Sequence, residues 1–240
     1  MNRYVYMGLR NWFRILPWAM DVARRNKWND HYSVTSNYQM IRKMTRSIIR
    51  KGHVKVEVTG EDLLPKASGY VILSNHQGFF DGMAIVEAME QPFHFLAMKE
   101  MKDFKFVKYV MEMMGSIYID REDIRQSLTA IKECADVVSK GENVLIFPEG
   151  TLEKEDNTLL PYKPGALKAA YLAKAPIVPI VLIDSFLPFD RRGCKPCTVR
   201  VEILKPYYYE DYKNLKTVEL AEMISKQSEI LLKDNKNINK

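Results

Sequence analysis

Several features that mark common protein classes are missing from this chain of 240 residues. It has only three cysteines, which cannot pair off evenly, so we expect no disulfide framework and a reducing compartment. No run of about 18 uncharged apolar residues occurs, which argues against a conventional membrane-spanning helix. The N-terminus also lacks the apolar core and the cleavage site of a secretory signal. A charged fraction of 28% and an aromatic fraction of 11% exclude a disordered or low-complexity chain.

Three widespread catalytic motifs are absent as well. The sequence has no G-x-S-x-G elbow, no Walker A sequence and no G-x-G-x-x-G, which disfavours a serine hydrolase, a nucleotide kinase and a dinucleotide enzyme. Cys194 and Cys197 form a C-x-x-C that precedes a predicted strand without further zinc ligands, and we interpret it as structural. We interpret His31, His53 and His94 as structural too.

Acidic residues are scarce in the first quarter of the chain. Residues 1–56 hold 12 lysines and arginines against two acids, Asp21 and Asp30, for a net charge of +10. The other residues hold 24 basic and 28 acidic side chains, for a net charge of −4. The formal charge of +6 therefore combines a basic N-terminal segment with a mildly acidic body.

The basic segment contains two amphipathic stretches. In residues 1–20, the spacing places basic side chains on one helical face (Arg3, Arg10, Arg14) and apolar ones on the opposite face (Val5, Leu9, Trp12, Leu16). Pro17 is expected to kink or end this helix. Residues 38–50 repeat the scheme, with an apolar side (Met40, Ile41, Met44, Ile48) and a basic side (Arg42, Lys43, Arg46, Arg50).

Helices of this kind suit an anionic membrane surface, because the apolar face enters the lipid and basic side chains meet the head groups. We therefore predict an N-terminal amphipathic two-helix membrane-binding motif. The alternative is that both helices dock on the body by their apolar faces. A nucleic acid is not expected as a partner, because the large apolar residues between the arginines would find no contact on a duplex.

The rest of the chain alternates between strand and helix patterns. Strands are predicted at residues 53–59, 70–73, 93–98, 116–119, 143–147, 177–183 and 198–204, and helices at 81–90, 100–114, 122–140, 164–174 and 217–233. This alternation predicts an α/β fold with a largely parallel mixed sheet flanked by helices. We divide the chain into membrane-interface helices (1–52), an α/β domain (53–233) and a frayed tail (234–240).

Polar side chains follow several of the predicted strands, at the sheet edge where ligands gather in such folds. His76 and Asp81 form an H-x4-D pair after the strand at 70–73. A carboxylate on one imidazole nitrogen fixes the tautomer and leaves the other nitrogen able to take a proton. From the residues alone, a His–Asp dyad and a helix-capping Asp beside a polar loop His both stay open.

Two cations also follow strands, Lys99 and Arg121. If they face one cleft, together with helix N-terminal N–H groups, they would suit a phosphate. The alternative is that Asp120 caps a helix and Arg121 forms only a salt bridge.

Glu149, Gly150 and Thr151 follow a buried strand in the stretch FPEGT. A carboxylate there could accept hydrogen bonds from substrate hydroxyls, and the glycine would let a ligand approach the backbone. An ordinary turn at the end of a strand fits the same residues.

Taken in order, these motifs resemble those of the glycerolipid acyltransferases, specifically the 1-acylglycerol-3-phosphate (lysophosphatidic acid) acyltransferases. NHQGFFD matches the family's H-x4-D motif, GSIYIDR matches the second motif, FPEGT matches the third, and PIVPIV from Pro176 resembles the fourth. The resemblance covers about residues 38–183. Three positions depart from the family's frequent residues: Gly78 stands for Ser, Tyr118 for Phe, and Leu152 for Arg.

The resemblance implies an enzyme of phospholipid biosynthesis that is bound peripherally to the cytoplasmic face of the cell membrane. It would transfer a fatty acyl group to lysophosphatidic acid from a thioester of acyl carrier protein or coenzyme A, with no metal and no cofactor. The implied site consists of His76 as general base, Asp81 as its orienting partner, Arg121 with Lys99 for the phosphate, and Glu149, Gly150 and Thr151 for the substrate. Because Leu152 replaces an arginine, the choice of phosphate-binding cations stays open.

Three other functions stay open. The acceptor could be another lysophospholipid or glycerol 3-phosphate. The protein could instead be a metal-dependent phosphoesterase, with metal ligands that activate water (His76, Asp81, Asp120 and Glu149). A non-catalytic peripheral lipid-binding protein would also carry the basic segment.

Overall fold

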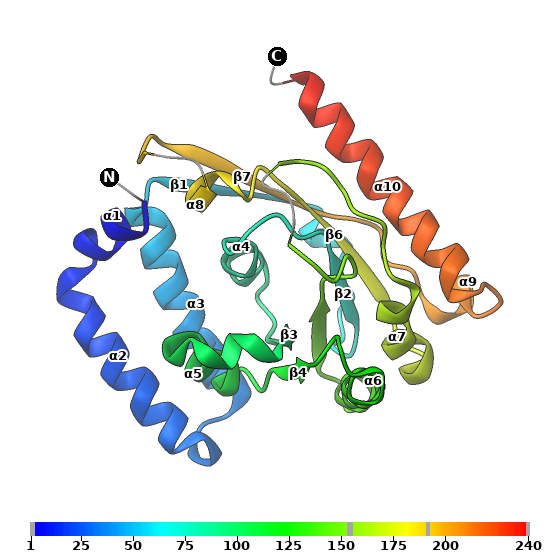
Figure 1. The fold of residues 1–240 in the computed structure, drawn as a ribbon, viewed down its shortest axis with the longest axis horizontal. Coiled ribbons are helices and arrows are strands. Elements are labelled where there is room, and N and C mark those ends of the chain that lie inside the picture. The colour runs from blue at the N-terminus through cyan, green and yellow to red at the C-terminus, as the bar shows by residue number, and fades with distance from the viewer. Residues whose placement is uncertain (1–2, 153–155, 191–192, 239–240) are drawn as a thin grey trace.

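The computed structural model describes residues 3–152, 156–190 and 193–238, and a seven-stranded sheet lies at its centre (Figure 1). The strands are β1 (Val54–Thr59), β2 (Val71–Ser74), β3 (Phe93–Met98), β4 (Ile117–Ile119), β5 (Asn143–Ile146), β6 (Ile177–Ile183) and β7 (Cys197–Ile203). Their spatial order is β1-β7-β6-β2-β5-β3-β4. Neighbouring strands are parallel except for β6 and β7. The predicted mixed, largely parallel α/β sheet is confirmed.

The three central strands β6, β2 and β5 are buried along their whole length. Their continuous apolar runs are typical of parallel strands that are covered on both faces. Successive residues of β2 enter different cores: Ile72 packs toward α3, α4 and α5, whereas Val71 and Leu73 pack toward α6, α7 and α10. The sheet is therefore sandwiched between two helical layers.

The helices follow the predicted pattern with shifts of a few residues. They are α1 (Arg3–Arg10), α2 (Trp12–Lys27), α3 (Val34–Lys51), α4 (Asp81–Ala88), α5 (Lys105–Met113), α6 (Ile124–Ser139), α7 (Lys168–Ala173), α8 (Leu187–Asp190), α9 (Tyr209–Tyr212) and α10 (Thr217–Ile238). Helix α10 extends to Ile238, so the tail predicted to fray from residue 234 begins inside this helix, and residues 239–240 lie outside the described part of the chain.

The first helical stretch breaks at Asn11 rather than at Pro17, which lies inside α2. The Asn11 side chain is buried, donates to the carbonyl of Met7 (2.8 Å) and accepts from the hydroxyl of Ser47 (3.2 Å). These bonds tie the junction between α1 and α2 to α3, so a tertiary contact sets the position of the break.

Helix α3 docks on the body. Tyr38, Ile41 and Met44 are buried in the core, and Arg46 pairs with Glu87 of α4 at 3.0 Å. Its apolar side is therefore not available to a membrane, and the prediction of a second interfacial helix is wrong for this face.

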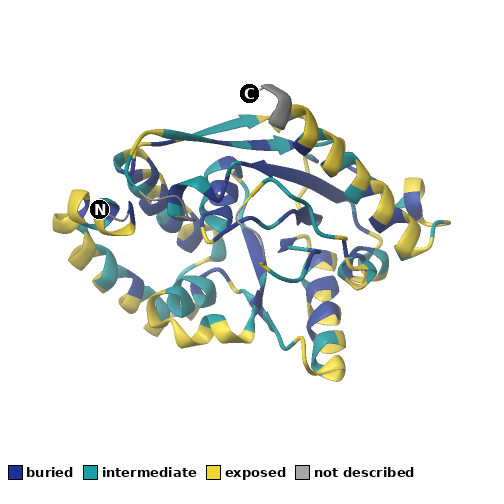
Figure 2. Cartoon of the chain, turned by 45° about the horizontal axis from the view of Figure 1, so that its top comes forward, coloured by how far each residue is buried: buried dark blue, intermediate teal, exposed yellow. Residues whose placement is uncertain are grey.

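Helices α1 and α2 show the opposite arrangement. The face predicted to be apolar is exposed: the exposed fraction is 72% for Trp12 and 68% for Leu16, and Val5 and Leu9 are exposed as well (Figure 2). Arg3 is instead buried and donates to the carbonyl of Lys195 (2.6 Å). Among the described helices, none is both long and apolar enough to cross a bilayer.

Candidate functional site

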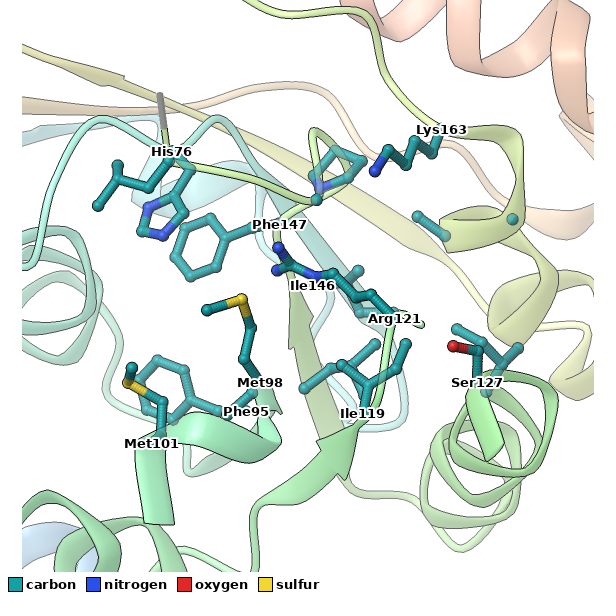
Figure 3. Close-up of a pocket in the computed structure, with 18 of the residues that line it drawn as sticks. His76, Phe95, Met98, Met101, Ile119, Arg121, Ser127, Ile146, Phe147 and Lys163 are labelled. Carbon is teal, nitrogen blue, oxygen red and sulfur yellow. The ribbon is translucent and has the colours of Figure 1, made fainter. Parts of the chain in front are cut away.

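A cavity of about 440 Å³ opens at the carboxyl ends of β2, β3, β4 and β5. Its wall is mainly apolar and includes Phe79 and Ile131. Phe95, Met98, Ile119 and Phe147 also belong to this wall (Figure 3). Sheets of this topology place ligands at this edge, because the loops that follow parallel strands converge there. His76, Arg121 and Gly150 lie in its wall.

His76 and Asp81 meet side chain to side chain. Nδ1 of His76 lies 2.6 Å from Oδ2 of Asp81, and the carboxylate is fully buried. The backbone N–H groups of Gln77 and Gly78 donate to the same Oδ2, at 2.6 and 3.0 Å. Asp81 is the first residue of α4 and does not cap it, since its bonds run back to the loop that carries His76.

Two further contacts fix the orientation of His76. Its ring stacks on Phe147 at a centroid distance of 4.3 Å and an interplanar angle of 18°. Its backbone N–H donates to Oε1 of Glu149 at 2.8 Å. With Nδ1–H bonded to Asp81, the ring has its basic lone pair on Nε2.

Glu149 holds the loops of the site together. Its second oxygen accepts from the N–H of Leu160 at 2.9 Å, and its side chain is buried. Burial raises the pKa of this carboxyl, against the lowering effect of the two backbone hydrogen bonds. Since both oxygens bond to backbone groups, Glu149 supports the loop that carries His76, and its contact with substrate hydroxyls stays a prediction.

The cations of the cavity differ from those expected. Among the described residues that line it, the lysines and arginines are Arg121, Lys163 and Lys168, and none of the described lining side chains is acidic. Lys99 is not part of this lining; its ammonium donates to Asp120 at 2.5 Å, and this bond lowers the pKa of the aspartate. Lys99 could reach a bound phosphate only if this pair opened.

The other residues of the predicted site, Asp120, Gly150 and Thr151, lie in or near the loops around the cavity. Asp123, rather than Asp120, caps α6, because its side chain accepts from the N–H groups of Arg125 and Gln126. Gly150 lines the cavity, and Thr151 follows it as a half-buried residue outside the lining.

A network of polar side chains supports the site. The Asn75 side chain forms two hydrogen bonds with the backbone of Leu182 in β6, at 2.9 and 2.7 Å, as a neighbouring strand would. Gln77 donates to Asn157 (2.8 Å), and Asn157 donates to Asp184 (2.8 Å). Asn75 and Gln77 flank His76 in the motif that follows β2, so the sequence places them near the site. Nothing in the loop sequence marked Asn157.

The described residues do not assemble the set of metal ligands that a metal-dependent phosphoesterase would need. Within the described residues, no group of three or more His, Cys, Asp or Glu side chains could hold a metal ion. His94 faces the carbonyl of Gly115 (2.9 Å) and the carboxylate of Glu142 (2.7 Å), which agrees with a structural role. Cys197 contacts Arg3 of α1 at 3.0 Å.

Comparison with known proteins places these observations in a family. The acyltransferase family model matches residues 55–183. The chloroplastic 1-acyl-sn-glycerol-3-phosphate acyltransferase BAT2 of Brassica napus is 33% identical over 175 residues, which cover 71% of this chain and 50% of that protein. The 1-acyl-sn-glycerol-3-phosphate acyltransferase of Borreliella burgdorferi is 31% identical, over 55% of this chain and 52% of that protein.

The fold has a solved counterpart. The crystal structure of the 1-acyl-sn-glycerophosphate acyltransferase PlsC from Thermotoga maritima matches with a TM-score of 0.76 at 19% identity, over 95% of each chain. This chain spans about half the length of the two relatives from Brassica napus and Borreliella burgdorferi. The family model covers more than half of the chain, which confirms the resemblance seen in the motifs. The chain therefore belongs to the acyltransferase family.

Proposed function

We propose that this protein transfers a fatty acyl group from a thioester to the free hydroxyl of lysophosphatidic acid, which yields phosphatidic acid for phospholipid synthesis. The observation that carries the proposal is the His76–Asp81 pair at the wall of an apolar cavity whose lysines and arginines have no acidic neighbour in the described lining. Such a cavity suits an acyl chain and a phosphate together. The names of the relatives support this choice of acceptor.

His76 would act as general base. Its Nε2 takes the proton of the acceptor hydroxyl while that oxygen attacks the thioester carbonyl carbon, and Asp81 stabilises the imidazolium that forms. The tetrahedral adduct then expels the sulfur, the C–S bond breaks, and the imidazolium returns its proton to the leaving thiolate. The products are an ester and a free thiol, and the imidazole is regenerated without an acyl-enzyme.

The apolar wall of the cavity would bind the acyl chain, and its cations would bind the phosphate. The donor's acyl chain would lie along Phe95, Met98 and Ile119, where it escapes water. Arg121 would pair with the phosphate, since a guanidinium forms two parallel hydrogen bonds with phosphate oxygens. The donor is a thioester of acyl carrier protein or coenzyme A.

The exposed apolar residues of α1 and α2 would hold the enzyme peripherally on the cytoplasmic face of the membrane. Basic residues gather behind them: the ammonium of Lys51 donates to the carbonyl of Arg10 (2.9 Å) and lies 4.3 Å from the ring of Phe13. Desolvation and three nearby arginines (Arg10, Arg14, Arg50) lower the pKa of Lys51. This crowding of positive charge would favour anionic head groups beside the inserted side chains.

Product analysis tests the proposal directly. The purified chain is incubated with lysophosphatidic acid and either palmitoyl-coenzyme A or palmitoyl-acyl carrier protein, with and without excess chelator. We expect phosphatidic acid and free thiol in equal amounts from at least one donor, with rates that the chelator does not change. Release of inorganic phosphate that the chelator abolishes would support the phosphoesterase instead, and vesicle binding without any turnover would support a lipid-binding protein.

A further inference from the structure

The side chain of Lys163 lies across the turn that contains Gly150. A Cβ atom added to Gly150 would come within 2.7 Å of the ammonium nitrogen of Lys163 and within 3.1 Å of its Cδ and Cε. Gly150 has φ +72°, in the left-handed region where a side chain is strained. The glycine thus does two things: it permits the turn, and it leaves the room that the lysine occupies.

The backbone keeps Lys163 in this place. Its N–H donates to the carbonyl of Pro148 at 2.9 Å, so the segment that carries the lysine is bonded to the turn that carries Gly150 and Glu149. Glu149 in turn accepts from the N–H of His76. Three backbone segments around the cavity are therefore linked, and the position of the lysine is coupled to that of the histidine.

Lys163 is available to a ligand. It lines the cavity, and no salt bridge joins it to any described carboxylate. Figure 3 shows its ammonium directed toward the part of the cavity near Phe147, where the guanidinium of Arg121 also lies. Lys99, in contrast, is already paired with Asp120.

We infer that Lys163 binds the phosphate monoester of the acceptor, together with Arg121. This assignment deepens the proposed function and rests on it. The acceptor's phosphate is joined to the same glycerol as the hydroxyl that His76 must reach. When that hydroxyl contacts the imidazole, the phosphate must therefore lie close to the imidazole as well. The phosphates of a coenzyme A or carrier-protein donor lie at the far end of the pantetheine arm. A cation that lies across the Gly150 turn, which is bonded to His76 through Glu149, therefore suits the acceptor rather than the donor.

The test measures KM for each substrate separately. In Lys163→Met, we expect KM for lysophosphatidic acid to rise about tenfold to a hundredfold, as the loss of a charge-assisted hydrogen bond predicts. Its kcat should stay within about twofold of the wild-type value, and KM for the thioester donor should not change. Lys163→Arg keeps the charge and should recover most of the loss. Lys226→Met, on the exposed side of α10, is the matched control and should behave as wild type.

A second acceptor identifies the group that Lys163 binds. Monoacylglycerol lacks the phosphate, so the rates of wild type and Lys163→Met with this acceptor should be equal. A rise in the donor's KM alone, or an equal loss with both acceptors, would overturn the assignment.

Calorimetric binding of glycerol 3-phosphate separates this assignment from the proposed function. Weaker binding by Lys163→Met than by wild type supports the assignment even if no ester forms. Equal binding overturns it even if the wild-type enzyme makes phosphatidic acid.

Discussion

Nδ1 of His76 lies 2.6 Å from Oδ2 of Asp81, and the same oxygen accepts the backbone N–H groups of Gln77 and Gly78. One carboxylate oxygen thus fixes both the imidazole and the loop that carries it. Because the histidine tautomer and the loop conformation depend on the same atom, this oxygen connects the chemistry of the site to the fold.

Replacement of Asp81 by Asn should therefore reduce both activity and stability. The amide has no negative charge to stabilise the imidazolium, and its single oxygen would have to accept all three of the hydrogen bonds that Asp81 accepts. We therefore expect kcat to fall by about 10²-fold or more. The free energy of unfolding should fall by about 1.5–3 kcal/mol, as for the loss of a charged hydrogen bond. Steady-state rates and urea unfolding check the two effects. A variant with wild-type kcat would show that the pair does not take part in turnover.

Glu149 should behave as a structural support. Glu149→Ala leaves the N–H groups of His76 and Leu160 without their acceptor, so we expect about 2–4 kcal/mol lower stability and a lower kcat. Glu149→Gln retains one acceptor oxygen and should lose less stability. If the residue instead held the glycerol of the substrate, Glu149→Gln would raise the acceptor's KM while urea unfolding stayed unchanged.

The Lys99–Asp120 pair can be checked by titration. The hydrogen bond from Lys99 is the main cause that lowers the pKa of Asp120 below its usual value. The stabilisation from this pair is therefore present above the pKa of an unfolded Asp, about 3.9, and is lost as the pH falls through the lower folded value. In Lys99→Met, NMR titration should show the pKa of Asp120 move upward. An unchanged titration would mean that the two side chains are not paired in solution.

Membrane binding is best tested by substitution within α2. Trp12→Ser with Leu16→Ser removes two exposed apolar side chains, each able to contribute about 1.5–3 kcal/mol when buried in lipid. We expect the affinity for anionic vesicles, measured by cosedimentation, to fall at least about tenfold. Removing residues 1–50 would not serve this purpose, because it would also take Tyr38, Ile41 and Met44 from the core.

The control for that experiment lies on α10. Met223→Ser with Ile230→Ser removes two other exposed apolar side chains, on the opposite side of the molecule from α2 (Figure 1). Its vesicle binding should equal that of wild type. An equal loss in both double variants would show that general surface hydrophobicity, rather than α1 and α2, controls the association.

Much of the architecture could be predicted because local pattern and tertiary burial agree. The apolar runs of β2, β5 and β6 are continuous because helices cover both faces of these strands. The H-x4-D spacing also permitted a contact between His76 and Asp81, because a short turn joins the strand to the next helix. Both the apolar runs and the H-x4-D spacing can be read from residues that lie close together in the sequence.

Features that depend on distant residues could not be predicted. The apolar side of α3 has the same period as that of α2, yet α3 packs on the sheet and the apolar face of α2 faces outward. Periodicity reveals that a face is apolar but not what covers it. Likewise Glu149 turns toward the backbone of Leu160, and Lys163 reaches Gly150, because a loop between β5 and α7 returns to the site.

The role of His76 as general base is tested most directly by the rate at which His76→Ala releases thiol from an acyl thioester in the presence of lysophosphatidic acid. We predict a fall in kcat of about 10²–10⁴-fold, the usual contribution of a positioned base, with unfolding in urea and binding of lysophosphatidic acid unchanged. A His76→Ala enzyme that folds normally and still makes phosphatidic acid at close to the wild-type rate would contradict it.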